Sequence, residues 1–207
     1  QHEVTVFEAD GHIGGHTHTH EIDAFGKRYN IDTGFIVYND WTYPNFIEML
    51  NTLGVETQSS DMSFSVHDEA SGLEYNGTSL NSLFAQRRNL FHPSFIGMIR
   101  DILRFNQEAP ALLDDHQADM PFGEYLKLNG YGEKFIAHYV IPMGSAIWSA
   151  SPDQMFEFPA KFFIRFFHNH GMLSVSDRPE WRVIKGGSKA YVEKLTQAFK
   201  DNIRLNT

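Results

Sequence analysis

The spacing of apolar residues along the chain indicates β-structure first. Residues 3–9 form a β-branched and aromatic run, which predicts a buried parallel strand. Residues 16–23 alternate between polar and apolar positions, as a half-buried strand does. A tight turn at residues 24–28 precedes a second strand-like run at residues 29–39. We therefore expect a hairpin behind the first strand.

The next part of the chain has helical spacing and then returns to short strands. Residues 42–55 place Phe46, Ile47, Leu50 and Leu53 on one helical face, and Gly54 is a natural C-terminal stop. The runs "MSFSVHD" and "LEYNG" are separated by "EASG", which predicts two short strands joined by a turn. A helix and a small β element should therefore follow the hairpin.

From Ser79 to about His170 the pattern is helical throughout. Asp153 is a candidate cap of a short helix. A further helix should occupy residues 159–171, with Pro159 in its first turn and Gly171 after its end. This region predicts a mostly helical insertion.

The end of the chain again has β/α character. "WRVIKGG" predicts a strand that runs into a glycine turn, and "NIRLN" predicts a final strand. Between them, residues 188–201 form an amphipathic helix with Ser188 as its expected N-cap. Because each flank resembles half of an α/β domain, we expect the two flanks to meet in space.

Composition excludes several classes of protein. The chain has 207 residues, of which 42% are hydrophobic and 21% charged, as in ordinary globular proteins. Its net charge of −9 argues against a sequence-independent nucleic-acid binder, which needs clustered Lys and Arg. Without cysteine there is neither a disulfide nor a thiolate metal ligand. No apolar run is long enough to span a bilayer, and we expect a cytoplasmic protein without a transmembrane segment.

The stretch "EADGHIGGHTHTHE", residues 8–21, carries the most chemistry. In a dinucleotide-binding βαβ unit, an acidic residue at a strand end accepts hydrogen bonds from the ribose hydroxyls, and Glu8 fits that role. The glycine-rich phosphate turn of such a unit lies about 20 residues upstream of the acid, which would place it before Gln1. The competing interpretation is a metal site. On a strand, His16, His18 and His20 would share one face, but a structural zinc site needs four ligands.

The run "VTVFEADGHIGGHTHT", followed by a hairpin and "IDTGFIVYN", resembles the flavin-binding segment of the amine oxidase superfamily. That superfamily includes monoamine oxidases, protoporphyrinogen oxidase and phytoene desaturases. Later runs such as "IPMGSAIWSASP" and "WRVIKGGSKAYVEKL" extend the resemblance over essentially all 207 residues. These runs resemble a group of amine-oxidase-like flavoproteins that are described as NAD/FAD-binding.

The resemblance implies an α/β fold with a partial Rossmann-like FAD-binding domain and an inserted, mostly α-helical substrate lobe. Residues 1–58 would be the first part of the FAD-binding domain, residues 59–185 the substrate lobe with a small β element, and residues 186–207 the return to the FAD-binding domain. The chain would be a fragment that lacks the N-terminal glycine-rich βα segment and the C-terminal part.

The resemblance also implies cofactor-binding residues around the glycine pair. Glu8 would hold the adenosine ribose of FAD. Gly14 and Gly15 would let the backbone approach the dinucleotide where a Cβ would clash. His16 and Thr17 occupy positions near the phosphates and the flavin where amine oxidases usually have Arg and Thr. A neutral imidazole offers one donor against five on Arg, so phosphate recognition would depend more on backbone N–H groups.

A second group of expected contacts lies behind the hairpin. Thr33, Gly34 and Phe35 would pass close to the isoalloxazine ring. The Gly186–Gly187 turn would return the chain from the substrate lobe to the FAD-binding domain. Because the chain has no cysteine, FAD would be bound non-covalently.

The implied function is that of an FAD-dependent oxidoreductase, which removes a hydride from an apolar or amine substrate. The partner would be a small-molecule substrate, lipid-like molecules included, and the fragment alone would be inactive. No residue is assigned as catalytic; His138, Tyr139 and His170 are candidates, but for each of them a structural role is favoured. The alternative is a non-catalytic module, either derived from a flavoprotein or binding a metal through histidines.

The aromatic run Phe156 to Phe167 has two interpretations. Phe162, Phe163, Phe166 and Phe167 fall at helical spacings, which favours core packing. The same run could instead line an apolar substrate chamber, whose open end would leave peripheral membrane contact as a further option. We take core packing as the expectation.

Overall fold

The computed structural model describes residues 2–114 and 120–207 and divides the chain into two compact units. Unit 1 comprises the described residues up to Asp61 together with Pro179–Thr207, and unit 2 comprises Met62–Arg178. The expected boundaries were at residues 58/59 and 185/186. In the structure, the strand Trp181–Ile184 pairs within unit 1. Helices and strands are mixed, as in an α/β protein.

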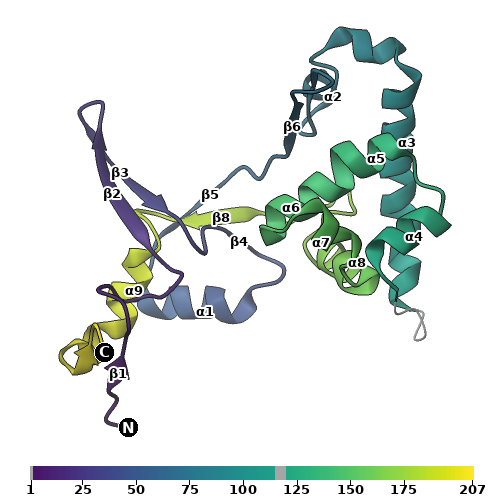
Figure 1. Cartoon of the computed structure of the whole chain (residues 1–207). Coiled ribbons are helices and arrows are strands. Elements are labelled where there is room, and N and C mark those ends of the chain that lie inside the picture. The colour runs from purple at the N-terminus through teal and green to yellow at the C-terminus, as the bar shows by residue number, and fades with distance from the viewer. Residues whose placement is uncertain (1, 115–119) are drawn as a thin grey trace. The chain divides into compact units, whose positions relative to one another are not determined.

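Unit 1 is built from short strands and two main helices (Figure 1). Strand β1 (Val6–Phe7) pairs in parallel with β9 (Ile203–Arg204). Strands β2 (Thr19–Ala24) and β3 (Lys27–Asp32) form the expected hairpin. The third sheet has the order β4-β8-β5, formed by Tyr38–Asn39, Trp181–Ile184 and Thr57–Ser59. Helices α1 (Pro44–Leu53) and α9 (Lys189–Thr196) lie side by side, and a 3₁₀ helix at Gln197–Asn202 leads into β9.

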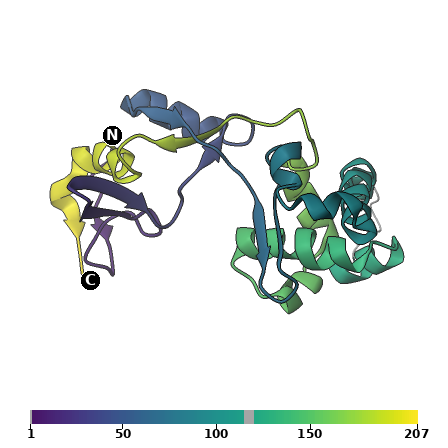
Figure 2. The same ribbon diagram turned by 90° about the horizontal axis from the view of Figure 1, so that it is seen from above.

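Unit 2 is mostly helical. It begins with the hairpin β6 (Ser65–Asp68) and β7 (Leu73–Asn76), which Figure 2 shows beside the helices of this unit. The main helix is α3 (Pro93–Glu108), which follows the 3₁₀ helix η1 (Arg87–Phe91). The other segments are α2 (Leu80–Leu83), a 3₁₀ helix at Ala109–Leu113, α4 (Phe122–Leu128), α5 (Glu133–Phe135), a π-helix at Ile136–Val140, α6 (Ile141–Trp148), α7 (Pro152–Phe156) and α8 (Ala160–Asn169).

The core of unit 2 is aromatic. Phe105 of α3 is fully buried, and its ring lies edge-on to those of Tyr131 and Phe167. Of the expected aromatic run, Phe163 and Phe167 are fully buried, which confirms the core interpretation for them. Phe162 is 54% exposed, so for this residue that prediction is wrong, because it lies on the outer face of α8.

Three other expectations also need correction. The strand Val6–Phe7 has the expected parallel partner, but Phe7 is 69% exposed because a two-stranded ribbon cannot cover both of its faces. Asp153 does not cap α7. The cap is Ser151, whose hydroxyl accepts a hydrogen bond from the Gln154 amide. Ser188 precedes α9 as expected, yet its side chain makes no capping hydrogen bond.

No helix in the described part of the chain is long and apolar enough to cross a membrane.

Candidate cofactor site

The Gly14–Gly15 pair forms a tight turn in which the Thr17 amide donates to the Gly14 carbonyl at 2.9 Å. Gly14 has φ +117°, and a Cβ there would lie 2.5 Å from the Thr17 carbonyl oxygen. Gly15 has φ +57°, but a Cβ there would meet nothing within 4 Å. Gly14 is therefore required by the chain's own packing. Gly15 has an open face that another molecule could approach.

The two predicted cofactor segments lie against each other. A Cβ on Gly34 would fall 1.4 Å from the His16 carbonyl oxygen, so only glycine allows this backbone approach. The Thr33 amide donates to the His18 carbonyl at 3.0 Å and extends the pairing of the hairpin. The structure thus brings His16 and Thr17 together with Thr33 and Gly34, although they are separated by the whole hairpin.

Phe35 and Glu8 lie apart from this pairing. The Phe35 ring is half-buried and packs edge-on against Phe46, with ring centroids 5.3 Å apart. Its backbone instead contacts the start of α9, where its carbonyl accepts from the Ser188 hydroxyl at 3.2 Å. Glu8 follows β1, and its carboxylate accepts one hydrogen bond, from the Asp10 amide at 3.0 Å.

Asp32, which was not among the predicted site residues, connects the β2–β3 hairpin to the start of α9. The Asp32 carboxylate accepts from the Ser188 amide at 2.9 Å, from the Ser188 hydroxyl at 3.0 Å and from the Thr19 hydroxyl at 2.5 Å. The Thr19 hydroxyl in turn accepts from the Lys189 amide at 2.9 Å. The N-terminus of α9, a natural anion site, is therefore already occupied by the chain's own carboxylate. This also explains why Ser188 does not cap the helix: its hydroxyl is directed to Asp32.

A second tie joins the Gly14–Thr17 turn to α9. The Thr17 hydroxyl and the Tyr191 hydroxyl are 2.7 Å apart in a partly buried position. Tyr191 belongs to the small apolar core of unit 1, which also contains Tyr38 and Leu50. The turn is thereby fixed to the core and to the hairpin independently.

A pocket of about 510 Å³ opens beside this turn. It is lined by Gly11, His12, Ile13, Thr17, His18, Thr19, Lys189, Val192, Glu193, Lys200, Ile203 and Leu205. The Lys189 ammonium donates to Glu21. Lys200 forms no ion pair within residues 2–114 and 120–207. The pocket therefore contains a cation that has no carboxylate partner among the residues that the structure describes.

The histidines are arranged differently from the expected metal face. Strand β2 begins only at Thr19, so His16 is not in the alternation. The rings that meet are those of His12 and His18, stacked at 3.9 Å, and of His18 and His20 at 4.1 Å. Burial, followed by the neighbouring His12 and His20, lowers the pKa of His18, and Asp10 opposes this shift. Among the described residues, no group of three potential ligands could hold a metal ion, so the geometry offers no support for the metal alternative.

The candidate catalytic residues of unit 2 have structural contacts. The Tyr75 hydroxyl donates to the His138 carbonyl at 2.7 Å, and the His138 ring lies 3.8 Å from the Asp68 carboxylate. Burial raises the pKa of Tyr139 to about 12. The His170 ring stacks on Phe166 at 3.9 Å. None of these contacts identifies a catalytic base.

Comparison with known proteins relates the chain to flavin enzymes. A family model described as "Flavin containing amine oxidoreductase" matches residues 1–207. Among solved structures, cyclohexylamine oxidase from Brevibacterium oxydans IH-35A is similar, with a TM-score of 0.65 and 14% identity over 98% of this chain and 45% of that one. Wild-type putrescine oxidase bound to putrescine matches with a TM-score of 0.53 and 19% identity over the same shares. At such identities the structures show a shared fold, and the chain spans less than half of their length. No curated protein matches the chain.

Proposed function

Because the chain belongs to the flavin-containing amine oxidoreductase family, we propose that the protein is an FAD-dependent oxidoreductase that removes a hydride from an amine or apolar substrate. The match over residues 1–207 carries this proposal. It also confirms the resemblance noted in the sequence and a flavin as the expected cofactor. We propose in addition that this flavin is FAD and that the reaction is removal of a hydride from the substrate.

The residues of unit 1 fit part of a flavin dinucleotide site. The open face of Gly15 leaves room for a ligand to approach the backbone. Gly15 belongs to the turn that lies beside the pocket containing Lys200. A diphosphate is an anion, and an unpaired ammonium group with exposed backbone suits it. The chain's own carboxylate fills the N-terminus of α9. The phosphates would therefore use the Gly15 turn and Lys200, with His16 beside them.

The other expected contacts stay proposals, with roles adjusted to the geometry. Glu8 would accept from the adenosine ribose, because among the described residues its carboxylate has a single partner, the Asp10 amide. Thr33 and Gly34 would border the isoalloxazine ring. Phe35 would contribute through its backbone, since its ring packs against Phe46. Residues Gly14–Thr17 and Thr33–Gly34 would act as one surface because Gly34 packs against the His16 carbonyl.

The flavin, when bound, supplies the hydride acceptor, and the protein supplies position and electrostatics. We propose that unit 1 is part of a Rossmann-like FAD-binding domain and that unit 2 is the substrate lobe. Putrescine and cyclohexylamine are small amines, and they name the enzymes of similar fold. A small amine, or a similarly sized apolar molecule, is the substrate class that we propose.

The test is a visible absorption spectrum of the purified chain and of a longer natural form that contains it. We expect flavin bands near about 375 and 450 nm in the longer form. The 207-residue chain should retain little FAD, because it spans 45% of the length of the similar structures. A colourless longer form that also fails to bind added FAD would refute the proposal. Stoichiometric FAD on the short chain would refute its weak-binding part.

A matched pair of glycine variants makes the test specific. Gly15 and Gly26 both have positive φ, and both have open space where a Cβ would lie. Replacing either by alanine imposes similar backbone strain, but only Gly15 belongs to the proposed site. In the longer form, we expect Gly15→Ala to weaken FAD binding at least about tenfold and Gly26→Ala to leave it unchanged. Equal losses would assign the effect to hairpin stability and remove Gly15 from the site.

A further inference from the structure

One segment of unit 2 differs in charge from the rest of the chain. Residues 75–100 contain no Asp or Glu, whereas the whole chain carries a net charge of −9. The same segment contains three arginines, Arg87, Arg88 and Arg100. It is therefore a local cationic region in an acidic protein.

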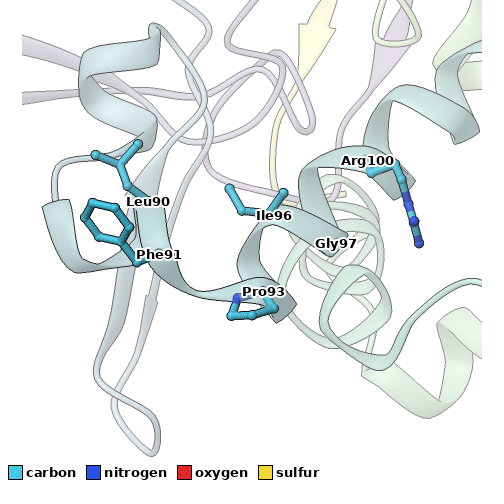
Figure 3. Close-up of a pocket in the computed structure, with 6 residues that line it drawn as sticks. All are labelled: Leu90, Phe91, Pro93, Ile96, Gly97 and Arg100. Carbon is cyan, nitrogen blue, oxygen red and sulfur yellow. The ribbon is translucent and has the colours of Figure 1, made fainter.

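Large apolar side chains are exposed in the same segment. Phe91, the last residue of η1, is 89% exposed, and Leu90 and Ile96 are about half exposed. Together with Pro93, Gly97 and Arg100 these residues line a shallow pocket of about 430 Å³. Figure 3 shows the side chains of Leu90 and Phe91 next to each other, with Pro93 and Ile96 in the first turn of α3 and Arg100 further along that helix. We call this set the η1–α3 surface.

Within residues 2–114 and 120–207, the arginines of this segment have no carboxylate partner. Arg87 donates to the Asn81 side chain at 2.5 Å and Arg88 to the Gly72 carbonyl at 3.1 Å. Both acceptors are neutral, so both positive charges stay uncompensated. Arg100 likewise forms no ion pair within residues 2–114 and 120–207. Among the described residues, Arg100 of the η1–α3 surface and the neighbouring Arg87 and Arg88 of η1 are therefore left to interact with an external anion.

The tip of the β2–β3 hairpin provides an internal contrast. Phe25 is 98% exposed there, and basic residues again follow it. At this tip, however, Arg28 forms a hydrogen-bonded ion pair with Asp23 at 3.0 Å and approaches Glu21 at 3.7 Å. The hairpin tip therefore combines the exposed aromatic ring with a single basic residue, Lys27, that forms no ion pair within residues 2–114 and 120–207, whereas the segment 75–100 has three such arginines.

We propose that the η1–α3 surface is a docking site for a membrane that contains anionic lipid. Apolar side chains beside unpaired basic residues are the combination that binds an anionic bilayer surface, where the rings enter the headgroup region and the cations contact the phosphates. The pair Leu90–Phe91 would insert, and Arg87, Arg88 and Arg100 would lie at headgroup level. The assignment is independent of the proposed flavin chemistry.

The first test uses sedimentation of the chain with vesicles of phosphatidylcholine alone or mixed with phosphatidylglycerol. We expect binding to the mixed vesicles and little to the neutral ones. Phe91→Ser should weaken the binding at least about tenfold, because a phenyl side chain no longer leaves water. Phe25→Ser, which removes an equally exposed ring, should leave the binding unchanged. Phe91 is on the surface, so its variant should keep the far-UV circular dichroism and the unfolding temperature of the parent chain.

The second test separates charge from insertion. Arg100→Gln should weaken vesicle binding about fivefold, and Arg28→Gln should have no effect because Arg28 is already neutralised. Added salt should weaken binding of the parent chain. Three results would overturn the proposal: no binding to anionic vesicles, equal losses for Phe91→Ser and Phe25→Ser, or equally strong binding to soluble polyglutamate that Phe91→Ser does not affect. The last result would indicate an acidic protein partner instead.

Discussion

The two units of the chain are stabilised in different ways. Among the described residues, the core of unit 2 contains eighteen buried residues, most of them apolar and many aromatic, whereas the core of unit 1 contains five. Unit 1 compensates with polar ties between distant parts of the chain, above all the carboxylate of Asp32. Apolar packing is non-directional and tolerates small shifts, whereas hydrogen bonds fix the backbone in one place. The unit that depends on polar ties is the one proposed to hold the cofactor, where backbone position matters most.

The chain's three tryptophans allow the units to be followed separately. Trp148 lies in unit 2, and Trp41 and Trp181 lie in unit 1. A chain with Trp148→Phe reports on unit 1, and a chain with both other tryptophans replaced reports on unit 2. Fluorescence-monitored denaturation of these two backgrounds measures the free energy of unfolding at each site.

The largest effect is expected from emptying the aromatic core. Phe105→Ala removes a fully buried ring and should lower the unfolding free energy of unit 2 by about 4 kcal/mol. Phe162→Ala is the matched control. That ring is half exposed, so its loss should cost less than about 1 kcal/mol. The Trp41 and Trp181 signals should not move. A similar loss of unfolding free energy at both sets of tryptophans would show that the two units unfold together and are not stabilised separately.

The next largest effect is expected in unit 1. Asp32→Ala leaves the buried Ser188 amide and the partly buried Thr19 hydroxyl without the carboxylate that accepts from them, and should lower the unfolding free energy of unit 1 by about 3 kcal/mol. Asp23→Ala also removes a carboxylate from the hairpin, but its ion pair with Arg28 is exposed and worth less than about 1 kcal/mol. A small loss for Asp32→Ala, equal to that of Asp23→Ala, would contradict the role given to the polar ties.

These contrasts also explain which features the sequence could predict. Helix α1 was predicted with its buried face and its stop at Gly54, and the structure confirms the stop, with Gly54 at φ +61°. The hairpin β2–β3 and the β6–β7 pair were also predicted. All of these depend on neighbouring residues, whose periodicity and turn chemistry are visible in a single sequence.

The role of Asp32 could not be predicted in the same way. Its partner Ser188 is 156 positions away, and no local pattern connects the two. The sequence offered one signal. The first amides of α9 need an acceptor, and the two glycines before Ser188 have no side chain that could provide one. The histidine arrangement was mispredicted for a related reason. The strand begins at Thr19, so the predicted alternation from His16 does not exist.

A smaller effect should come from the tie between the glycine turn and α9. Tyr191→Phe removes the hydroxyl that lies 2.7 Å from the Thr17 hydroxyl and keeps the ring in the core. We expect a loss of about 1 kcal/mol in the unfolding free energy of unit 1. Tyr29→Phe, on the exposed hairpin, should change it by less than about 0.5 kcal/mol. If Tyr191→Phe and Tyr29→Phe behave alike, the Gly14–Thr17 turn is held by its packing against Gly34 and not by the Tyr191 hydroxyl.

The smallest effect is expected from pH and concerns the stacked histidines of unit 1. Burial and the adjacent His12 and His20 lower the pKa of His18 from its ordinary value of 6.5. The unfolded chain therefore takes up the proton first as the pH falls, so this contribution to stability is complete above pH 6.5 and is lost between pH 6.5 and the lowered pKa. The Trp41 and Trp181 signals should show this loss, and His18→Gln should reduce it.

Unit 2 provides the comparison for this pH dependence. The pKa of His138 is also lowered, by burial and then by Lys134, with Asp68 opposing the shift. Trp148 should therefore report a loss of stability in the same direction as the pH falls, because this unfolded-state histidine also binds the proton first. His18→Gln should leave the Trp148 profile unchanged, since the two histidines belong to different units. If His18→Gln flattens both profiles, the histidine stack acts on the whole chain, and the stability of unit 1 is not set by its own polar contacts alone.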